Sequence, residues 1–307
     1  AIWPFTVVGR PPQEDTRFGE LIHELSGAAL QKEIPGLLEI HAVDAAGVHP
    51  LLLAIGQERY TPYQPDQRPA ELLTIANHIL GSGQLSLAKY LFITEDRSGQ
   101  LSTHDIAGYF TYLFQRVNWN RDIHFHTQTS IDTLDYSGNG LNSGSKAVIA
   151  ACSEALRTLC LEIPDCIKEN RFFRAVHLVL PGVVAIETKS FHSYEDAEKE
   201  MEQLHDIMQP NLQELNEVAL LVLCDDAAFL AKQLANFLWV TFTRSNPSHD
   251  IYGLQTHQQY KHWGCAGPLI IDARIKPHHA PVLEKDPAIE KRIDHLFTKS
   301  GPLAAWG

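Results

Sequence analysis

The sequence predicts an α/β protein made of two tandem, internally duplicated α/β domains. Amphipathic helical segments alternate with short apolar segments of the kind that form buried strands in a parallel sheet. The same order of segments occurs twice along the chain. The motif R-x-N-x-x-x-D-I of residues 116–123 also returns at residues 244–251. A repeated element order with the same polar motif indicates an internal duplication.

The first half begins with a β-branched and aromatic run at residues 2–8, which is typical of the continuation of a β-strand. We interpret the chain as a fragment whose earlier residues have been cut away. An amphipathic helix follows, with apolar residues at helical spacing from Phe18 to Leu25. Strands are then expected at 37–43, 50–55, 88–94 and 123–127, and helices at 69–80 and from Thr103, a candidate N-cap.

The second half repeats this order. Strands are expected at 175–186, around a turn, and at 218–223, and helices at 194–208 and through 234–242. Residues 262–269 occupy the place of the first half's glycine-rich loop, with Pro268 near the position of Lys146. Because proline offers neither an N–H nor a charge, the second copy is expected to be degenerate. The two predicted α/β domains are residues 16–164 and 165–307.

Composition excludes several classes of function. The 307 residues are 44% apolar, and the formal net charge is -12 without any stripe of lysine and arginine, which argues against a nucleic-acid-binding face. Five cysteines without a C-x-x-C pair suggest neither a disulfide framework nor a zinc ribbon, and they fit a reducing cytoplasm. No apolar run is long enough to span a membrane. We therefore expect a cytoplasmic protein with no nucleic-acid partner and no membrane span.

The stretch DTLDYSGNGLNSGSKAVIAACSE, residues 132–154, is the strongest candidate for a binding site. Its three glycines, between residues 138 and 144, can adopt positive φ, so that successive N–H groups turn inward around an anion, and Lys146 would add a charge. A helix expected to begin at about Ala147 would direct its free N–H groups at the same anion. The spacing matches neither the phosphate-loop motif nor the dinucleotide fingerprint, so a flexible surface loop with a solvated lysine is the alternative.

Other reactive side chains favour structural roles. His124 and His126 share one face of a predicted strand, as metal ligands could, but no third ligand is near in the sequence. His278 and His279 are consecutive and point apart in an extended chain, which favours a surface or an interface. Cys152 has no activating partner and is expected to be buried and inert. None of these residues is assigned to a metal site.

Charged residues recur at matching places in the two halves. In each of the two repeated motifs, the arginine and the aspartate are expected to form an ion pair that fixes a helix-to-strand connection. The acidic pairs at 95–96 and 225–226 follow buried strands, where open α/β sheets place ligands, and helix capping or solvent exposure is the alternative. No nucleophile–base pair, carboxylate dyad or complete metal set can be assembled from the sequence.

Taken together, these features resemble the C-terminal part of the UbiD family. The resemblance rests on AIWPFTVVGRPPQE at the start, a buried strand ending in an acidic pair, the motif of residues 116–122, and LDYSGNGLNSGSK, and it covers about residues 1–155. Residues 165–290 resemble the same domain again, more weakly. The family comprises prenylated-flavin-dependent decarboxylases of aromatic and acrylic acids, including the polyprenyl-4-hydroxybenzoate decarboxylases of ubiquinone biosynthesis.

The resemblance implies a larger protein whose split-barrel domain binds prenylated FMN with a divalent metal, followed by an α/β domain that completes the pocket and forms a homo-oligomer. It implies that residues 1–15 are the end of that split-barrel flavin domain. It implies that Lys146, with Ser145 and Gly144, reaches the cofactor phosphate, and that Arg10 and Pro11 lie near the substrate end of the pocket. The family's catalytic arginine, its proton-donating acid and its metal ligands belong to the upstream part. No catalytic or metal-binding residue is therefore expected in this chain.

The predicted function is that of the C-terminal fragment of a UbiD-like decarboxylase for an aromatic or α,β-unsaturated carboxylic acid similar to 3-polyprenyl-4-hydroxybenzoate. The fragment alone is expected to be inactive and to bind no prenylated FMN, which a flavin prenyltransferase would supply to the full protein. One alternative is a nucleotide-binding module for NAD or ATP, although residues 131–136 are too polar for the buried first strand of a dinucleotide fold. The other is a module used purely for oligomerisation.

Overall fold

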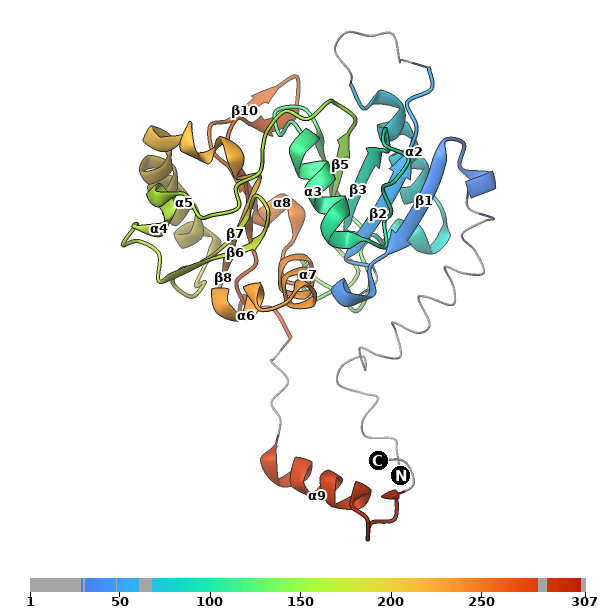
Figure 1. Ribbon diagram of the computed structural model, residues 1–307, viewed down its shortest axis with the longest axis vertical. Coiled ribbons are helices and arrows are strands. Elements are labelled where there is room, and N and C mark those ends of the chain that lie inside the picture. Colours follow the sequence, from blue (N-terminus) through green and yellow to red (C-terminus); the bar gives the residue numbers. More distant parts are fainter. Residues whose placement is uncertain (1–28, 30, 48, 61–67, 281–285, 305–307) are drawn as a thin grey trace.

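Two five-stranded mixed sheets lie beside each other in the computed structural model, which describes residues 29, 31–47, 49–60, 68–280 and 286–304 (Figure 1). The first sheet has the strand order β1-β2-β3-β5-β4. Its elements are β1 (Leu37–Ala42), β2 (Leu51–Gly56), α2 (Ala70–Leu80), β3 (Tyr90–Glu95), α3 (Ile106–Arg116), β4 (Ile123–Thr129) and β5 (Gly144–Ala151), with 3₁₀ turns η2 (Asp44–Ala46) and η3 (Gly83–Leu87).

The second sheet has the order β6-β7-β8-β12-β9. Its elements are α4 (Asp165–Lys168), β6 (Ala175–Leu180), β7 (Val183–Glu187), α5 (Tyr194–Met208), η4 (Gln209–Asn211), η5 (Glu214–Glu217), β8 (Leu220–Cys224), α6 (Ala227–Ala231), α7 (Leu234–Thr243), α8 (Pro247–Asp250), β9 (Ile251–Gly253) and β12 (Leu269–Asp272). A separate hairpin joins β10 (Thr256–Gln259) to β11 (His262–Cys265), and the C-terminal helix α9 (Pro287–Phe297) has no buried residue.

The two sheets share one pairing scheme. In the first, β1 runs antiparallel to β2, β2 and β5 run parallel to β3, and β4 runs antiparallel to β5. In the second, β6 runs antiparallel to β7, β7 and β12 run parallel to β8, and β9 runs antiparallel to β12. Strands β6, β7, β8, β9 and β12 therefore correspond in order and direction to β1, β2, β3, β4 and β5.

A single apolar core joins the two sheets. It combines side chains of β2, β3, β5 and α3 with side chains of β7, β8, β12 and α7. Within it, the rings of Phe110 and Phe242 stack with 6.1 Å between centroids, and Trp119 donates an indole N–H to the carbonyl of Ala219 at 2.9 Å. Separate apolar clusters cover the outer faces, one under α2 and one under α5. The halves are thus packed together as one folded body.

The structure departs from the predicted elements in two places. Residues from Ala147 belong to the buried interior strand β5 and not to a helix, because their apolar side chains fill both faces between β3 and β4. The N-cap of α3 is Asp105, which accepts the N–H of Gly108 at 3.1 Å. Thr103 is instead bound through its N–H and hydroxyl to the carboxylate of Glu39.

The remaining predicted strands and helices of the described part lie within about three residues of their expected ends, and α5 matches them at both ends. The opening strand at 2–8, the helix at 18–25, and the proposed substrate-pocket residues Arg10 and Pro11 lie outside the described residues. Of the helices that the structure describes, none combines the length and apolar character needed to cross a bilayer.

Candidate functional site

The glycine-rich loop connects β4 to β5 and is closed by its own backbone. The N–H of Asn139 donates to the carbonyl of Ser143 at 2.8 Å, and the N–H of Ser143 donates to that of Gly140 at 3.2 Å. Gly140 is the one loop glycine with a positive φ, +152°. These two N–H groups therefore bond within the loop, and of the three glycines that could adopt a positive φ only Gly140 does so.

Gly138 and Gly144 are required for close packing. A Cβ on Gly138 would lie 2.2 Å from the carbonyl oxygen of Ser143 and 2.6 Å from Cδ1 of Ile131. A Cβ on Gly144 would lie 2.8 Å from the same Cδ1 atom. All three distances are far below van der Waals contact, so the loop can fold tightly over Ile131 only without side chains at these positions.

Lys146 points into the protein from the start of β5. Its side chain is 4% exposed, and Nζ donates to the carbonyls of Ser86 at 2.8 Å and Ala88 at 3.0 Å. Burial lowers the pKa of Lys146 to about 8, and the negative charge of Asp135 opposes that shift. No carboxylate of the described residues lies within ion-pair distance of Nζ. An ammonium carries three N–H donors, so one remains for an anionic oxygen.

A second lysine, which sequence reasoning missed, holds the loop against the first sheet. Lys89 precedes β3 and is 1% exposed; its Nζ lies 2.7 Å from Oδ2 of Asp135 and 2.6 Å from Oγ of Ser137. Burial lowers the pKa of Lys89, and the carboxylate of Asp135 opposes this. The sequence signal was a lysine directly before an apolar strand, with an aspartate in the loop, but nothing in it indicated that they meet.

Ser145 connects the loop to the second sheet. Its hydroxyl donates to Oδ1 of Asn246 and accepts the N–H of Ser248 at 2.8 Å. Both Ser145 and Asn246 are 1% exposed. Nearby, the hydroxyls of Tyr90 and Ser245 are 2.7 Å apart. The candidate site is therefore built from both halves of the chain, which the sequence did not reveal.

The repeated motif forms the same turn twice. The backbone N–H of Asn118 donates to Oδ2 of Asp122 at 2.8 Å, and that of Asn246 donates to Oδ2 of Asp250 at 2.6 Å. In return, the N–H of each aspartate donates to the carbonyl of its asparagine. The spacing of four residues is what lets one side chain cap its own turn in this way.

The expected arginine–aspartate ion pairs are wrong in both motifs. The guanidinium of Arg116 lies 3.5 Å from the ring centre of Tyr112 and donates to its carbonyl, and Arg244 lies 3.7 Å from Asp225. Asp122 pairs with Arg121, and Asp250 lies 3.2 Å from Lys276. In both motifs, one carboxylate oxygen of the aspartate accepts the asparagine N–H, and the other oxygen faces a cation that is not the motif arginine.

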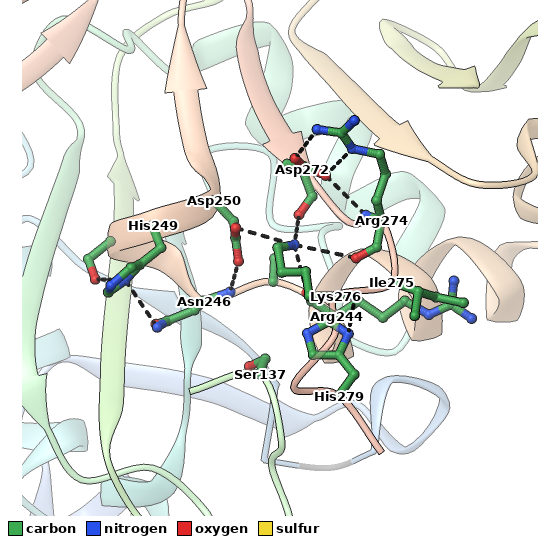
Figure 2. A network of polar contacts seen from close by, with 12 residues as sticks. Ser137, Arg244, Asn246, His249, Asp250, Asp272, Arg274, Ile275, Lys276 and His279 are labelled. Carbon is green, nitrogen blue, oxygen red and sulfur yellow. Dashed lines mark hydrogen bonds and ion pairs between the residues drawn. The ribbon is translucent and has the colours of Figure 1, made fainter. Parts of the chain in front are cut away.

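Figure 2 shows the buried network behind the second turn. Nζ of Lys276 donates to the carbonyl of Asp272 at 2.9 Å, and Arg274 binds the carboxylate of Asp272 through two nitrogens. Burial raises the pKa of Asp250 to about 6, although Lys276 opposes the shift. His279 accepts the N–H of Lys276 at 3.2 Å, so it faces inward, whereas His278 is exposed.

Of the other candidates, His126 lies opposite Lys146 in the pairing of β4 with β5, and the charge of Lys146 adds to the burial that lowers the pKa of His126. His124 and His126 are on β4, where burial and neighbouring His262 lower the pKa of His124 to about 4. Across the described residues, no three His, Cys, Asp or Glu side chains are grouped to hold a metal. Cys152 is buried, which raises the pKa of its thiol to about 12 and fits an inert role.

The acidic pairs after β3 and β8 serve local structure. Glu95 pairs with Arg97 at 3.1 Å, and Asp96 accepts backbone N–H groups of the following turn. Asp225 accepts the N–H of Ile275 at 2.7 Å, and Asp226 caps α6 through Phe229. These contacts agree with helix and turn capping.

Comparison with known proteins adds a family to this geometry. Residues 16–151 match the 3-octaprenyl-4-hydroxybenzoate carboxy-lyase C-terminal domain family. The chain is 31% identical over 301 residues to a subunit of the 4-hydroxybenzoate decarboxylase of Chlamydia pneumoniae, covering 97% of this chain and 47% of that protein. It is 30% identical to an uncharacterized protein of Chlamydia trachomatis, covering 95% and 46%. The chain thus spans about half the length of these relatives.

Among solved structures, the apo 3,4-dihydroxybenzoic acid decarboxylase of Klebsiella pneumoniae aligns with 50% of this chain and 32% of its own, at 17% identity and a TM-score of 0.37. A score this low does not establish a shared fold. The relation to known proteins rests on the sequence matches, which include the whole stretch from β1 to β5.

Proposed function

The chain carries the C-terminal domain of the UbiD carboxy-lyase family in residues 16–151, and from this we propose that it is the C-terminal part of a UbiD-like decarboxylase. The full protein would act with prenylated FMN and a divalent metal on an aromatic or α,β-unsaturated carboxylic acid similar to 3-polyprenyl-4-hydroxybenzoate. The chemistry that the bound flavin supplies is carbon-centred covalent catalysis of decarboxylation. The residues of this chain would bind and orient, and we assign none of them to the chemical step or to the metal.

One observation carries the assignment of Lys146 to the cofactor phosphate. Its ammonium is buried, has a lowered pKa, and has two neutral carbonyls but no carboxylate as partners in the described structure. A buried cation without a counter-charge is costly, and an anionic oxygen within reach of its third N–H would relieve that cost. Gly144 and Ser145 would place the lysine by fixing the start of β5.

The second sheet is, in this proposal, a duplicated copy of the first. The shared strand order, the shared pairing directions and the identical capped turns support the duplication. Its counterpart of Lys146 is Pro268, so we assign it no cofactor contact. A structural role, or a role in forming a homo-oligomer, is the function that remains, and we place the protein in the cytoplasm with a flavin prenyltransferase as cofactor supplier.

The nucleotide-binding alternative loses its main support. It required a helix N-terminus after the loop to face the phosphates, whereas the loop leads into the buried strand β5. A strand start presents no aligned set of free N–H groups. A module used only for oligomerisation would leave the buried ammonium of Lys146, which has no carboxylate within ion-pair distance among the described residues, without a purpose.

Calorimetric titration of the chain with FMN, NAD and ATP, repeated on Lys146→Ala, tests the proposal. Under the proposal, NAD and ATP do not bind tightly, and FMN binding is weak or absent until the upstream half is restored. With that half present, FMN binding should weaken at least tenfold in Lys146→Ala, as expected for loss of a charge-assisted hydrogen bond. Tight NAD or ATP binding that Lys146→Ala abolishes would refute the proposal, as would decarboxylation of an aromatic acid by the isolated chain with prenylated FMN.

A further inference from the structure

We infer that Asn246, a residue of the second half, is the positioning residue for the glycine–lysine segment of the first half. The segment is the loop from Asn139 to Ser145 together with Lys146. That the positioned group is a cofactor ligand rests on the proposed function. The positioning itself rests only on the contacts of the side chain.

The amide of Asn246 binds both ends of the loop. Its Oδ1 accepts the hydroxyl of Ser145, which is the residue directly before Lys146, and its Nδ2 donates to Oδ1 of Asn139 at 3.3 Å. The second N–H of the same amide is directed at Nδ1 of His249, 3.1 Å away. One carbonyl and two N–H groups are thereby all used, so the side chain is held in a single orientation. Its two loop contacts fix the separation of the loop ends.

Comparison with the first turn shows that the contact of the asparagine side chain with the other half is particular to Asn246. Asn118 occupies the same place in an identical backbone turn, yet its side chain accepts the N–H of Asn120 at 3.1 Å, two residues away. The turn by itself therefore needs no long-range contact from its asparagine. Only the second turn directs its side chain into the other half, where it meets the loop that ends in Lys146.

The support behind Asn246 is rigid. Its backbone N–H is bound by Asp250, and Asp250 lies 3.2 Å from the fully buried ammonium of Lys276, as Figure 2 shows. Lys276 is in turn bound to the carbonyl of Asp272, at the end of the interior strand β12. The loop is thus tied to the sheet of the second half as well as to that of the first, which gives the otherwise unassigned half a role at the site.

Hydrogen exchange of the loop amides in the intact chain tests the inference. The amides of Asn139 and Ser143 close the loop, and in Asn246→Ala we expect both to exchange about tenfold faster, the equivalent of one lost buried hydrogen bond. Ser145→Ala, which keeps the contact of Asn246 with Asn139, should loosen them less, and the double variant should loosen them no more than Asn246→Ala, because Asn246→Ala already removes the contact with Ser145. Asn118→Ala is the matched control and should leave both amides unchanged.

A second readout separates this inference from the proposed function. Lysine side chains labelled with ¹³C-methyl groups allow the pKa of Lys146 to be followed by NMR, with and without added FMN in the protein that includes the upstream half. If FMN leaves the pKa of Lys146 unchanged in the wild type, the proposed phosphate contact is refuted, but loop exchange still decides the inference. Wild-type exchange in Asn246→Ala, or equal loosening in Asn118→Ala, would overturn the inference whatever FMN does.

Discussion

Lys89 and Asp135 form a buried ion pair, with 2.7 Å between Nζ and Oδ2 and side chains that are 1% and 4% exposed. The pair fastens the glycine-rich loop to the first sheet, while Asn246 fastens it to the second. The carboxylate of Asp135 also accepts the N–H and the hydroxyl of Ser137, so all of its bonds lie within this one region. Removing it should leave a buried cation without compensation.

We therefore expect Asp135→Asn to lower the free energy of unfolding by about 3 kcal/mol, because breaking a buried pair at one partner exposes the full desolvation cost of the other. Urea unfolding followed by circular dichroism measures this. The exposed pair Lys199–Glu195 is the matched control, and Lys199→Ala should change stability by less than about 0.5 kcal/mol. The double variant Lys89→Met/Asp135→Leu should recover part of the loss. A loss below about 1 kcal/mol in Asp135→Asn would contradict the prediction.

Gly138→Ala should destabilise the protein by about 2 kcal/mol, since the new Cβ would lie 2.2 Å from a backbone oxygen that cannot move without opening the loop. Gly81, at the C-terminus of α2, is the control: its φ is -89° and a Cβ there would be at least 3.4 Å from other atoms. Gly81→Ala should leave stability unchanged or raise it slightly. Thermal unfolding of both variants is the measurement. Equal melting temperatures of Gly138→Ala and Gly81→Ala would contradict the prediction, because they would show that the loop accommodates a Cβ at residue 138.

The buried carboxylate of Asp250 predicts a pH dependence of stability. Its pKa is about 6 in the folded protein, above the ordinary value of 3.8, because burial outweighs the attraction of Lys276. The folded state then binds more protons than the unfolded state between these values, so stability falls as this group ionises. We expect the unfolding free energy of the wild type to decrease relative to that of Asp250→Asn as the pH rises from about 4 to about 6. Above about pH 6, the two unfolding free energies should change with pH in parallel.

Asp96 provides a control of opposite sign. Burial raises its pKa, but hydrogen bonds from Ser98, Leu101 and Gly99 outweigh this and hold the pKa below 3.8. Its contribution to stability is therefore present above that pH and lost as the pH falls through the folded pKa. Wild type and Asp250→Asn curves that stay parallel from pH 4 to 8 would show that Asp250 does not titrate as its burial requires.

The sequence predicted those elements whose signals are local. The helix α5 has its limits where the periodicity placed them, because Ser193 caps its first turn and the apolar positions recur every three or four residues. The repeated motif was also visible, and both copies do form one turn. What the motif binds was not visible, since the aspartates bond to backbone N–H groups and to lysine or arginine side chains outside the expected pairs.

The strand β5 shows why the rest could not be predicted. The alanine-rich run after Lys146 favours a helix by propensity, but its place between β3 and β4 gives it hydrogen bonds and burial on both sides. The partners of Lys146, Ser86 and Ala88, are about sixty residues away in the sequence. Long-range contacts of this kind decided both the fold of the segment and the burial of its lysine.

The shared core predicts that the two halves cannot be separated at the expected boundary. A chain ending at residue 164 would expose the faces of β3, β5 and α3 that pack against α7 and β8, including the ring of Phe110. Apolar surface of that extent drives association or dye binding in an isolated half. We expect residues 29–164 alone to bind an apolar fluorescent dye and to aggregate, and coexpression with residues 165–280 to restore a soluble complex.

Truncation after residue 280 is the matched control for this prediction. It removes more than twenty residues, including α9, but α9 contributes no buried side chain, so the melting temperature should change by less than about 2 °C. The full chain should also unfold in a single transition, since the core crosses between the sheets and Trp119 binds the carbonyl before β8. A first half that is monomeric, does not bind the dye and unfolds cooperatively would show that the two sheets are independent domains, and that the contacts between them add little to stability.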